Sequence, residues 1–229
     1  MFEGNGAFGR RCKNTAEGKA ADIQRNVEYL QQYIKGKPRT LYNIGVGHEP
    51  HNEAKAFKQL WPDIQIVGLE PDLKIFCDRV GEYVGVLYPW GLWKENGLCE
   101  FSISSTHGWS SLLPPQEKWV SNTELTFTGG ILISCVTLDH LDEKLGRPQD
   151  IFLWMDIEGA ELGALEGGKD TLASGRVKWI DVEVSHTPRR VGEPSEDMIS
   201  EYLQRYGYRK MVRYGNAKTF HNVLYELKG

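Results

Sequence analysis

The sequence lacks the features that mark membrane-spanning and secreted proteins. None of its apolar runs approaches the length of about 18 residues that a membrane-spanning helix needs. The richest apolar window, residues 177–184, has the length of a strand and contains Lys178 and Asp181. Residues 1–13 are rich in glycine and basic residues, without the apolar segment of about 7–15 residues that a secretory signal carries. We therefore expect no membrane span and a cytoplasmic protein.

Paired cysteines and excess positive charge are also missing. The four cysteines lie far apart and form no C-x-x-C pair, which indicates neither a zinc knot nor a disulfide framework; they are Cys12, Cys77, Cys99 and Cys135. With 27 Lys and Arg against 31 Asp and Glu, the net charge is −4. This acidity argues against nucleic acid as a partner, because nucleic-acid-binding surfaces are basic. We expect free thiols and a small-molecule or glycan substrate.

The chain contains enough apolar material for one α/β domain. Its 229 residues are 40% hydrophobic and 25% charged, which excludes a wholly disordered chain. No repeat, low-complexity tract or linker divides the sequence. We expect an N-terminal extension over residues 1–15, either a mobile end or a lid, followed by a single domain over residues 16–229.

Strands and helices alternate along the sequence. Its apolar pattern predicts helices at about 16–34, 50–60, 72–80, 160–172 and 195–206 and one from residue 139, and strands at 41–44, 64–69, 83–87, 98–103, 131–138, 151–155 and 177–184. Residues 208–214 and 219–227 flank Gly215-Asn216, which predicts a hairpin. This order is typical of a mainly parallel sheet with helices on both faces, finished by an antiparallel hairpin. Such sheets bind ligands beyond the carboxyl ends of their strands.

A glycine turn and an acid mark two of these strand ends. The first strand runs through Asn43 into Gly45-Val46-Gly47, and Glu70-Pro71 follows the second strand, with Glu70 23 residues after Gly47. Closely spaced glycines let the backbone approach a ligand, and a strand-end acid at this distance typically binds ribose hydroxyls. We expect Asn43, Gly45, Gly47, Glu70 and Pro71 to bind a nucleoside cofactor.

The residues after the glycine turn distinguish between nucleosides. A dinucleotide fold has a third glycine where this sequence has Pro50, preceded by Glu49. A carboxylate beside a diphosphate is repelled, whereas the ammonium of a methionine moiety tolerates it. S-adenosyl-L-methionine therefore fits better than NAD, and an NAD-linked oxidoreductase is the alternative enzyme class.

Two further segments carry a family resemblance. T-L-D-H-L at residues 137–141 and D-I-E-G-A-E at 156–161 resemble the signature of the FkbM family of S-adenosylmethionine-dependent methyltransferases. The likeness covers roughly residues 40–208, and Gly91-Leu92 and Glu183 sit where similar sequences have their strand-end features. It implies a Rossmann-like class I methyltransferase fold with a seven-stranded sheet. It also implies methyl transfer to a hydroxyl of a sugar, glycolipid or small natural product, with Gly91 near the cofactor. Trp90 lies at a strand end, and we expect its ring to stack on adenine or on a sugar ring.

The sequence departs from the family pattern at three positions. Asn43 stands where the family usually has Asp, Glu49 where it has a further glycine, and Trp154 where a lysine is common. A methyltransferase-like binding domain without activity is therefore a second alternative.

The D-I-E-G-A-E segment offers the chemistry that a hydroxyl acceptor requires. Asp156 ends the fourth parallel strand with Glu158 and Glu161 beside it, and neighbouring carboxylates raise one another's pKa, which suits a general base. We expect Asp156 and Glu158 to be catalytic and Asp156 also to touch the cofactor. Glu158 and Glu161 both have the alternative role of complementing the dipole of the helix that follows them. A divalent cation between Asp156 and Glu183 is another way to acidify the hydroxyl, although the spacing does not demand a metal.

An irregular segment over residues 106–120 contains the third candidate base. Long irregular stretches inside compact domains are usually functional or mobile, and we expect this one to cover the acceptor pocket. His107, in S-T-H-G-W-S-S, is either a base above that pocket or an ordinary loop histidine.

Overall fold

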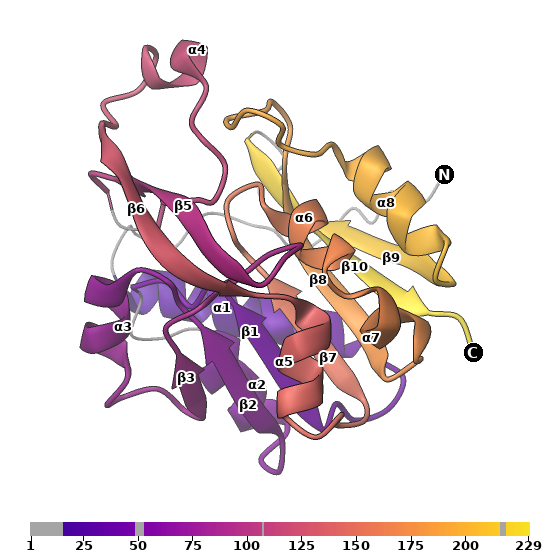
Figure 1. Ribbon diagram of the computed structural model, residues 1–229. Coiled ribbons are helices and arrows are strands. Elements are labelled where there is room, and N and C mark those ends of the chain that lie inside the picture. The colour runs from indigo at the N-terminus through magenta and orange to yellow at the C-terminus, as the bar shows by residue number, and fades with distance from the viewer. Residues whose placement is uncertain (1–15, 49–52, 107, 216–218) are drawn as a thin grey trace.

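The computed structural model describes residues 16–48, 53–106, 108–215 and 219–229 (Figure 1). The predicted extension over residues 1–15 and His107 lie outside the described residues. The helices are α1 (Ala16–Gln31), α2 (Glu53–Leu60), α3 (Leu73–Arg79), α4 (Glu117–Val120), α5 (Leu138–Lys144), α6 (Glu161–Glu166), α7 (Lys169–Ala173) and α8 (Glu196–Gln204). The strands are β1 (Thr40–Ile44), β2 (Gln65–Leu69), β3 (Val86–Tyr88), β4 (Gly91–Leu92), β5 (Gly97–Ser104), β6 (Phe127–Val136), β7 (Ile151–Met155), β8 (Val177–Ser185), β9 (Tyr208–Tyr214) and β10 (Phe220–Leu227).

Seven strands form one sheet in the order β3-β2-β1-β7-β8-β10-β9. The first five are parallel to one another, and β10 runs antiparallel to both β8 and β9. The predicted class I methyltransferase architecture, with its antiparallel C-terminal hairpin, is therefore confirmed. The strand order reverses between β1 and β7, and the carboxyl edge of a sheet at such a reversal is where ligands bind.

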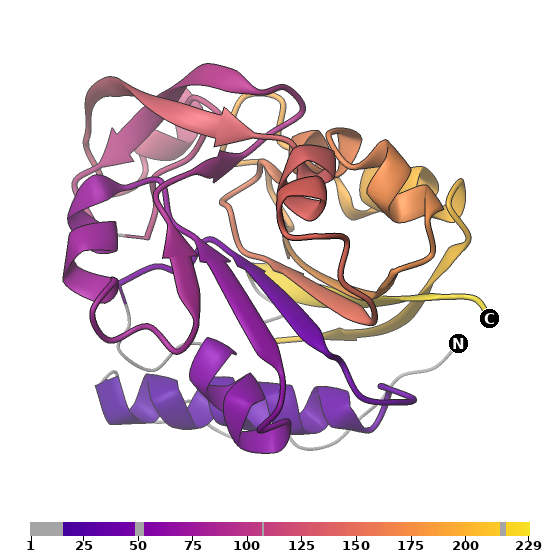
Figure 2. The same cartoon turned by 60° about the horizontal axis from the view of Figure 1, so that its bottom comes forward.

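Helices cover both faces of the sheet (Figure 2), and side chains that alternate along the strands build a core on each face. Leu41 of β1 faces α1 and α2, where Val27 and Phe57 are fully buried. Tyr42, the next residue, faces the opposite layer of α5, α6, α7 and α8. A strand buried on both faces has a continuous apolar run, and burial of each large apolar side chain contributes about 1.5–3 kcal/mol.

A second, three-stranded sheet in the order β4-β6-β5 lies beside the carboxyl edge of the first. It accounts for the predicted strand at 98–103, which is β5, and for the strand predicted to begin at residue 131, which begins at Phe127. One of its faces packs Phe101, Ile133 and Cys135 into a small core. The cysteines Cys77, Cys99 and Cys135 are free thiols.

The helix predicted over residues 160–172 is wrong as one element, because it is split into α6 and α7. Gly167-Gly168 separates them, and a Cβ atom at Gly167 would overlap the backbone carbonyl of Trp93. The chain needs glycine here to let β4 and its following turn approach the helix. The third predicted strand is also shorter than expected, since β3 begins at Val86 rather than at residue 83.

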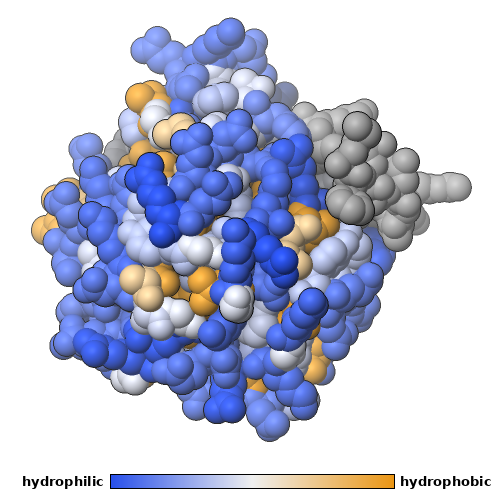
Figure 3. All heavy atoms as spheres, turned by 90° about the vertical axis from the view of Figure 1, so that its right-hand side faces the viewer, coloured by the Kyte–Doolittle hydropathy of each residue, from blue (hydrophilic) through white to orange (hydrophobic). Residues whose placement is uncertain are grey.

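Hydrophilic residues cover most of the face that carries α8 and β9 (Figure 3). Arg209, Lys210 and Arg213 lie along β9, the edge strand, and charged side chains on an edge strand oppose pairing with another chain. No helix in the described ranges is long and apolar enough to cross a membrane.

Candidate active site

A cavity of about 490 Å³ lies at the carboxyl edge of the seven-stranded sheet, where the strand order reverses. Its walls come from the ends of β1, β2, β7 and β8, from β4 and β5, and from the segment after β5. The predicted site residues that line it are Gly45, Gly47, Glu70, Pro71, Trp90, Gly91, Asp156 and Glu158. Eight predicted residues from four segments of the sequence therefore line one cavity.

The turn after β1 needs glycine because another backbone segment approaches it closely. Gly45 has a φ of 82°, and a Cβ atom there would overlap the backbone carbonyl of Asp156. Gly47 has a φ of 66°, but a Cβ atom at this position would meet nothing within 4 Å. Gly45 is thus needed for the contact between the ends of β1 and β7, whereas Gly47 leaves open space beside the cavity.

Glu70 is the best-anchored acid at the cofactor end of the cavity. Its Oε2 accepts a hydrogen bond of 2.9 Å from the Gly47 backbone, and its Oε1 accepts one of 2.9 Å from the Asp72 backbone. Burial raises the pKa of Glu70 to about 7, although these two hydrogen bonds oppose the shift. Each carboxylate oxygen has a second lone pair, so Glu70 can still accept hydrogen bonds from a ligand.

Two other predicted residues differ in their surroundings. Asn43 does not line the cavity: it is fully buried, and its Nδ2 donates to the hydroxyl of Tyr83 at 3.2 Å. It lies on the α1 and α2 side of β1 because side chains alternate along a strand. Trp90 does line the cavity, with one face of its indole stacked on Tyr88 at a ring separation of 4.5 Å.

Carboxylates converge on the opposite side of the cavity. Asp156, Glu158 and Glu183 each offer an oxygen atom, and these atoms lie within 4.8 Å of one another. Glu158 has a φ of 56°, a left-handed conformation that is uncommon outside glycine and is often found at functional sites. Glu161 supports this turn, because its Oε1 accepts from the Ile157 backbone at 3.1 Å and the Gly159 backbone at 3.4 Å. Of Glu161's two predicted roles, the structural one matches these contacts.

The sequence reasoning missed Arg189, the cation that faces these carboxylates. Arg189 lies 3.3 Å from Glu158 Oε2 and 3.4 Å from Glu183 Oε2, and its guanidinium also lies over the Trp109 ring at 5.1 Å. Burial lowers the pKa of Arg189, but the neighbouring carboxylates more than offset this and raise it. The available signal was the need for a cation near buried acids, with Arg189-Arg190 following shortly after β8.

Burial dominates the titration of the acidic cluster. It raises the pKa of Glu158 to about 8 against the opposing charge of Arg189, and it also raises the pKa of Asp156. The pKa of Glu183 is raised well above its ordinary range by burial and by the charges of Asp156 and Glu158. These raised pKa values favour the protonated forms of the three carboxyls up to a higher pH than for exposed carboxyls, and such shifts are common at acid–base sites.

Arg190 contacts the segment that covers the cavity and holds it in place. Its side chain is fully buried, its Nη2 donates to the Trp109 backbone carbonyl, and its guanidinium lies 5.0 Å from the rings of Trp119 and Phe127. Ser111 Oγ adds a hydrogen bond of 2.9 Å to the Glu158 backbone carbonyl. The segment predicted to cover the pocket is therefore joined both to the loop after β8 and to the acidic turn.

The cavity's chemistry fits a sulfonium nucleoside. Gly47 leaves room near the Glu70 carboxylate, and the charged side chains that line the space are carboxylates apart from Arg189. The cluster's oxygen atoms are also close enough to hold a divalent cation. Such a cation would compete with Arg189 for Glu158 and Glu183, the two carboxylates that Arg189 already pairs with.

Comparisons with known proteins agree with this geometry. The methyltransferase FkbM domain matches residues 16–210. A 2-O-methyltransferase, NoeI, from Sinorhizobium fredii (strain NBRC 101917 / NGR234) is 28% identical over 150 residues, covering 60% of this chain and 61% of the relative. The chain thus matches about three fifths of that relative's length.

Solved structures with a similar arrangement have low sequence identity. Magnesium protoporphyrin IX methyltransferase (ChlM) from Synechocystis PCC 6803, with bound SAM, is 9% identical, has a TM-score of 0.49, and matches over 96% of this chain and 88% of its own. The METTL16 methyltransferase domain is 12% identical, also has a TM-score of 0.49, and matches over 95% and 70%. The family match spans most of the chain and includes the D-I-E-G-A-E turn. The protein therefore belongs to the FkbM methyltransferase family.

Proposed function

We propose that the protein transfers a methyl group from S-adenosyl-L-methionine to a hydroxyl of a sugar, a glycolipid or another small hydroxylated molecule. The observation that carries this proposal is the pairing, in one cavity, of Glu70 beside the glycine turn with the Asp156 and Glu158 carboxylates opposite. The first is suited to a ribose and the second to an acceptor proton. The name of the matched relative, a 2-O-methyltransferase, supports a hydroxyl acceptor.

Glu70 and the glycine turn would hold the cofactor. The two backbone hydrogen bonds fix the Glu70 carboxylate, so little side-chain freedom is lost when a ribose binds. Trp90 adds an aromatic surface next to Gly91. When bound, S-adenosyl-L-methionine supplies an electrophilic methyl group. Alignment of two bound reactants can contribute about 7–11 kcal/mol to such a transfer.

Asp156 would accept the proton of the acceptor hydroxyl. No hydrogen-bond donor among the described residues contacts its carboxylate, whereas Arg189 holds Glu158 and Glu183. Its raised pKa places proton transfer closer to neutral pH than an exposed aspartate would allow. Glu158 shares this environment and is the second candidate to hold the proton.

Aromatic residues make the remaining wall suitable for a sugar ring. Phe101, Trp109 and Phe220 line the cavity, and the Arg189 guanidinium lies 5.1 Å from the Trp109 ring and 5.9 Å from the Phe220 ring. Apolar ring faces pack against the C–H faces of sugars, while the carboxylates contact hydroxyls. This wall favours a glycan or small hydroxylated acceptor over a protein side chain.

Transfer of an isotopically labelled methyl group from S-adenosyl-L-methionine to a panel of sugars and hydroxylated aromatics tests the proposal. We expect methylation of at least one acceptor, and a loss of about 10²–10⁴-fold in turnover for Asp156→Asn. The cofactor affinity of this variant should stay within a few-fold of wild type. Asp78→Asn, which changes an exposed acid on α3, is the matched control. Undiminished turnover in Asp156→Asn would remove Asp156 from the reaction.

A further inference from the structure

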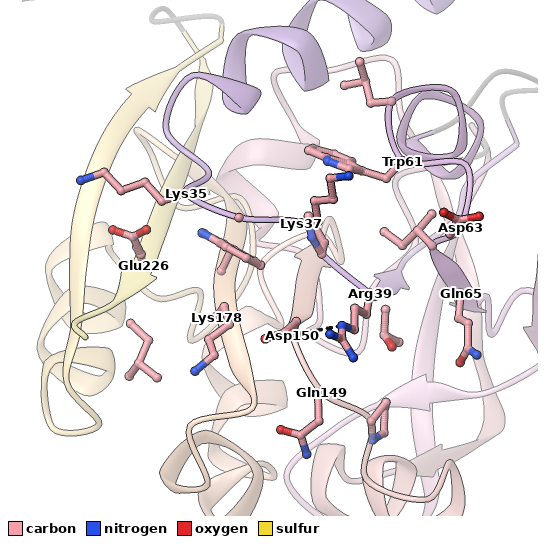
Figure 4. A pocket seen from close by; sticks show the side chains of 18 of the residues that line it. Lys35, Lys37, Arg39, Trp61, Asp63, Gln65, Gln149, Asp150, Lys178 and Glu226 are labelled. Carbon is pink, nitrogen blue, oxygen red and sulfur yellow. Dashed lines mark ion pairs between the residues drawn. The ribbon is translucent and has the colours of Figure 1, made fainter.

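A second and larger concavity lies at the opposite edge of the seven-stranded sheet. This groove has a volume of about 1140 Å³ and is formed by the loop after α1, the turn after α2, the loop before β7 and parts of β8 and β10 (Figure 4). We name it the amino-edge groove, because it lies where the parallel strands begin. The five residues of β1 separate it from the methyl-transfer cavity by about 15 Å.

The amino-edge groove is basic although the protein is acidic. Six of the side chains that line it are lysine or arginine and three are acidic, while the whole chain has a net charge of −4. Two of the acids are already paired: Arg39 Nε lies 3.2 Å from Asp150 Oδ2, and Arg209 Nη2 lies 3.0 Å from Glu226 Oε2. The groove therefore has positive charge that its own carboxylates do not neutralise.

Three of the four lysines that line the groove come from two separate segments. Lys35 and Lys37 lie in the loop after α1, and Lys178, near the start of β8, lies below Lys35 in Figure 4. Within the described part of the chain, no carboxylate lies at ion-pair distance from any of the three. A ligand that pairs with all three ammonium groups is expected to present several negatively charged oxygen atoms, because each ammonium is a separate unit charge.

A buried donor without a partner lies in the same wall. Trp179 is 4% exposed, and its indole Nε1 has no acceptor among the described residues. The neighbouring edge of its ring packs 3.7 Å from the position that a Cβ atom at Gly36 would occupy. An unsatisfied buried N–H costs about 1–3 kcal/mol, so a ligand that displaces the atoms covering Nε1 and places an acceptor oxygen there would recover part of this energy.

Indole rings also give the amino-edge groove an apolar surface. Trp61, which lines it above Lys37 in Figure 4, packs against Phe57 with a ring separation of 5.3 Å. Lysines arranged around an indole surface suit a compact molecule that joins phosphate groups to an apolar or aromatic part. We propose that the amino-edge groove binds a small molecule carrying a diphosphate group.

Titration calorimetry at low salt tests this proposal with inorganic pyrophosphate and with ADP as probes. We expect both to bind the wild-type protein, and ADP more tightly because its nucleoside can contact Trp61. Lys35→Glu/Lys178→Glu should weaken both affinities at least tenfold, and Trp179→Phe should weaken them a few-fold. Lys118→Glu/Lys169→Glu is the matched control, because it makes the same charge change at exposed lysines outside the described cavities.

Three further measurements separate the outcomes. S-adenosylhomocysteine should bind all these variants as it binds wild type, which shows that they are folded and that the groove is independent of the cofactor cavity. Equal pyrophosphate affinity in the two double variants would overturn the proposal. The proposal would also be overturned if a single-stranded RNA bound more tightly than ADP and this RNA binding were lost in Lys35→Glu/Lys178→Glu. That result would show that the groove binds a nucleic-acid polymer. Binding of phosphatidic acid vesicles with the same dependence on Lys35 and Lys178, but no binding of pyrophosphate or ADP, would also overturn it.

Discussion

Glu158→Gln should make the protein more stable at neutral pH while reducing its activity. The Glu158 side chain is 12% exposed, and burial raises its pKa from an ordinary 4.5 to about 8. Between these two values the folded protein keeps a proton that the unfolded chain releases. The stability of the folded state therefore falls as the pH rises from 4.5 to 8, and glutamine removes this penalty because it does not ionise.

The size of the effect follows from the width of this window. Each pH unit above the unfolded pKa costs about 1.4 kcal/mol, so the penalty reaches about 3 kcal/mol at pH 7 and stays below about 1 kcal/mol at pH 5. For a domain of this length, 1 kcal/mol corresponds to about 2–4 °C in Tm. Thermal unfolding should show Glu158→Gln about 6–12 °C above wild type at pH 7 and within a few degrees of it at pH 5.

A control variant and a pH profile test this interpretation. Glu117→Gln alters an exposed acid on α4 and should leave the Tm unchanged at both pH values. The wild-type kcat/KM should rise with pH until about 8, and Glu158→Gln should move this rise to lower pH, because the nearby carboxyls titrate together. An equal gain in Tm at pH 5 and pH 7 would refute the reasoning, since the gain would then not depend on the ionisation of Glu158.

Two further substitutions test the cofactor end of the cavity. Glu70→Ala should weaken S-adenosylhomocysteine binding by roughly tenfold to a hundredfold in calorimetry, because the variant loses a charged hydrogen bond worth about 1.5–3 kcal/mol. Unchanged affinity would exclude Glu70 from the site. In urea unfolding, Gly47→Ala should lower the stability by about 1 kcal/mol, because alanine disfavours the left-handed backbone at this position. Gly45→Ala should lower it by more, because only a Cβ atom at Gly45 also overlaps the Asp156 backbone. Equal losses of stability in the two alanine variants would show that overlap with the Asp156 backbone does not destabilise Gly45→Ala.

The sheet and one half of the cavity could be predicted from the sequence because they depend on local signals. Alternating strands and helices fix a parallel sheet, and a parallel sheet places strand ends at one edge. Gly45, Gly47 and Glu70 lie directly at such ends, so their meeting follows from topology alone. The D-I-E-G-A-E turn was found through its family resemblance, and the φ of 97° at Gly159 explains why a glycine stands at that position.

The parts that could not be predicted depend on contacts between distant segments. Arg189 and Arg190 lie in a loop after β8, and the bonds from Arg190 to the Trp109 segment join residues 81 positions apart. No local pattern specifies such a pairing. Asn43 was expected at the cofactor because it precedes the glycine turn, but the strand's alternation points it toward Tyr83. The interruption between α6 and α7 depends in turn on Trp93 of another segment.

Hydrogen bonding distinguishes the acids that support the fold from Asp156, the acid that we propose for the reaction. Asp181 is fully buried, yet it accepts hydrogen bonds of 2.9 Å from both Tyr214 and Asn222, so its lone pairs are used within the protein. Glu161 is used in the same way by the turn that it caps. Asp156 lines the cavity, and no donor in the described segments bonds its carboxylate. An acid kept near a cavity at a cost in stability, with its oxygen atoms left available, is positioned for an external hydroxyl rather than for the fold.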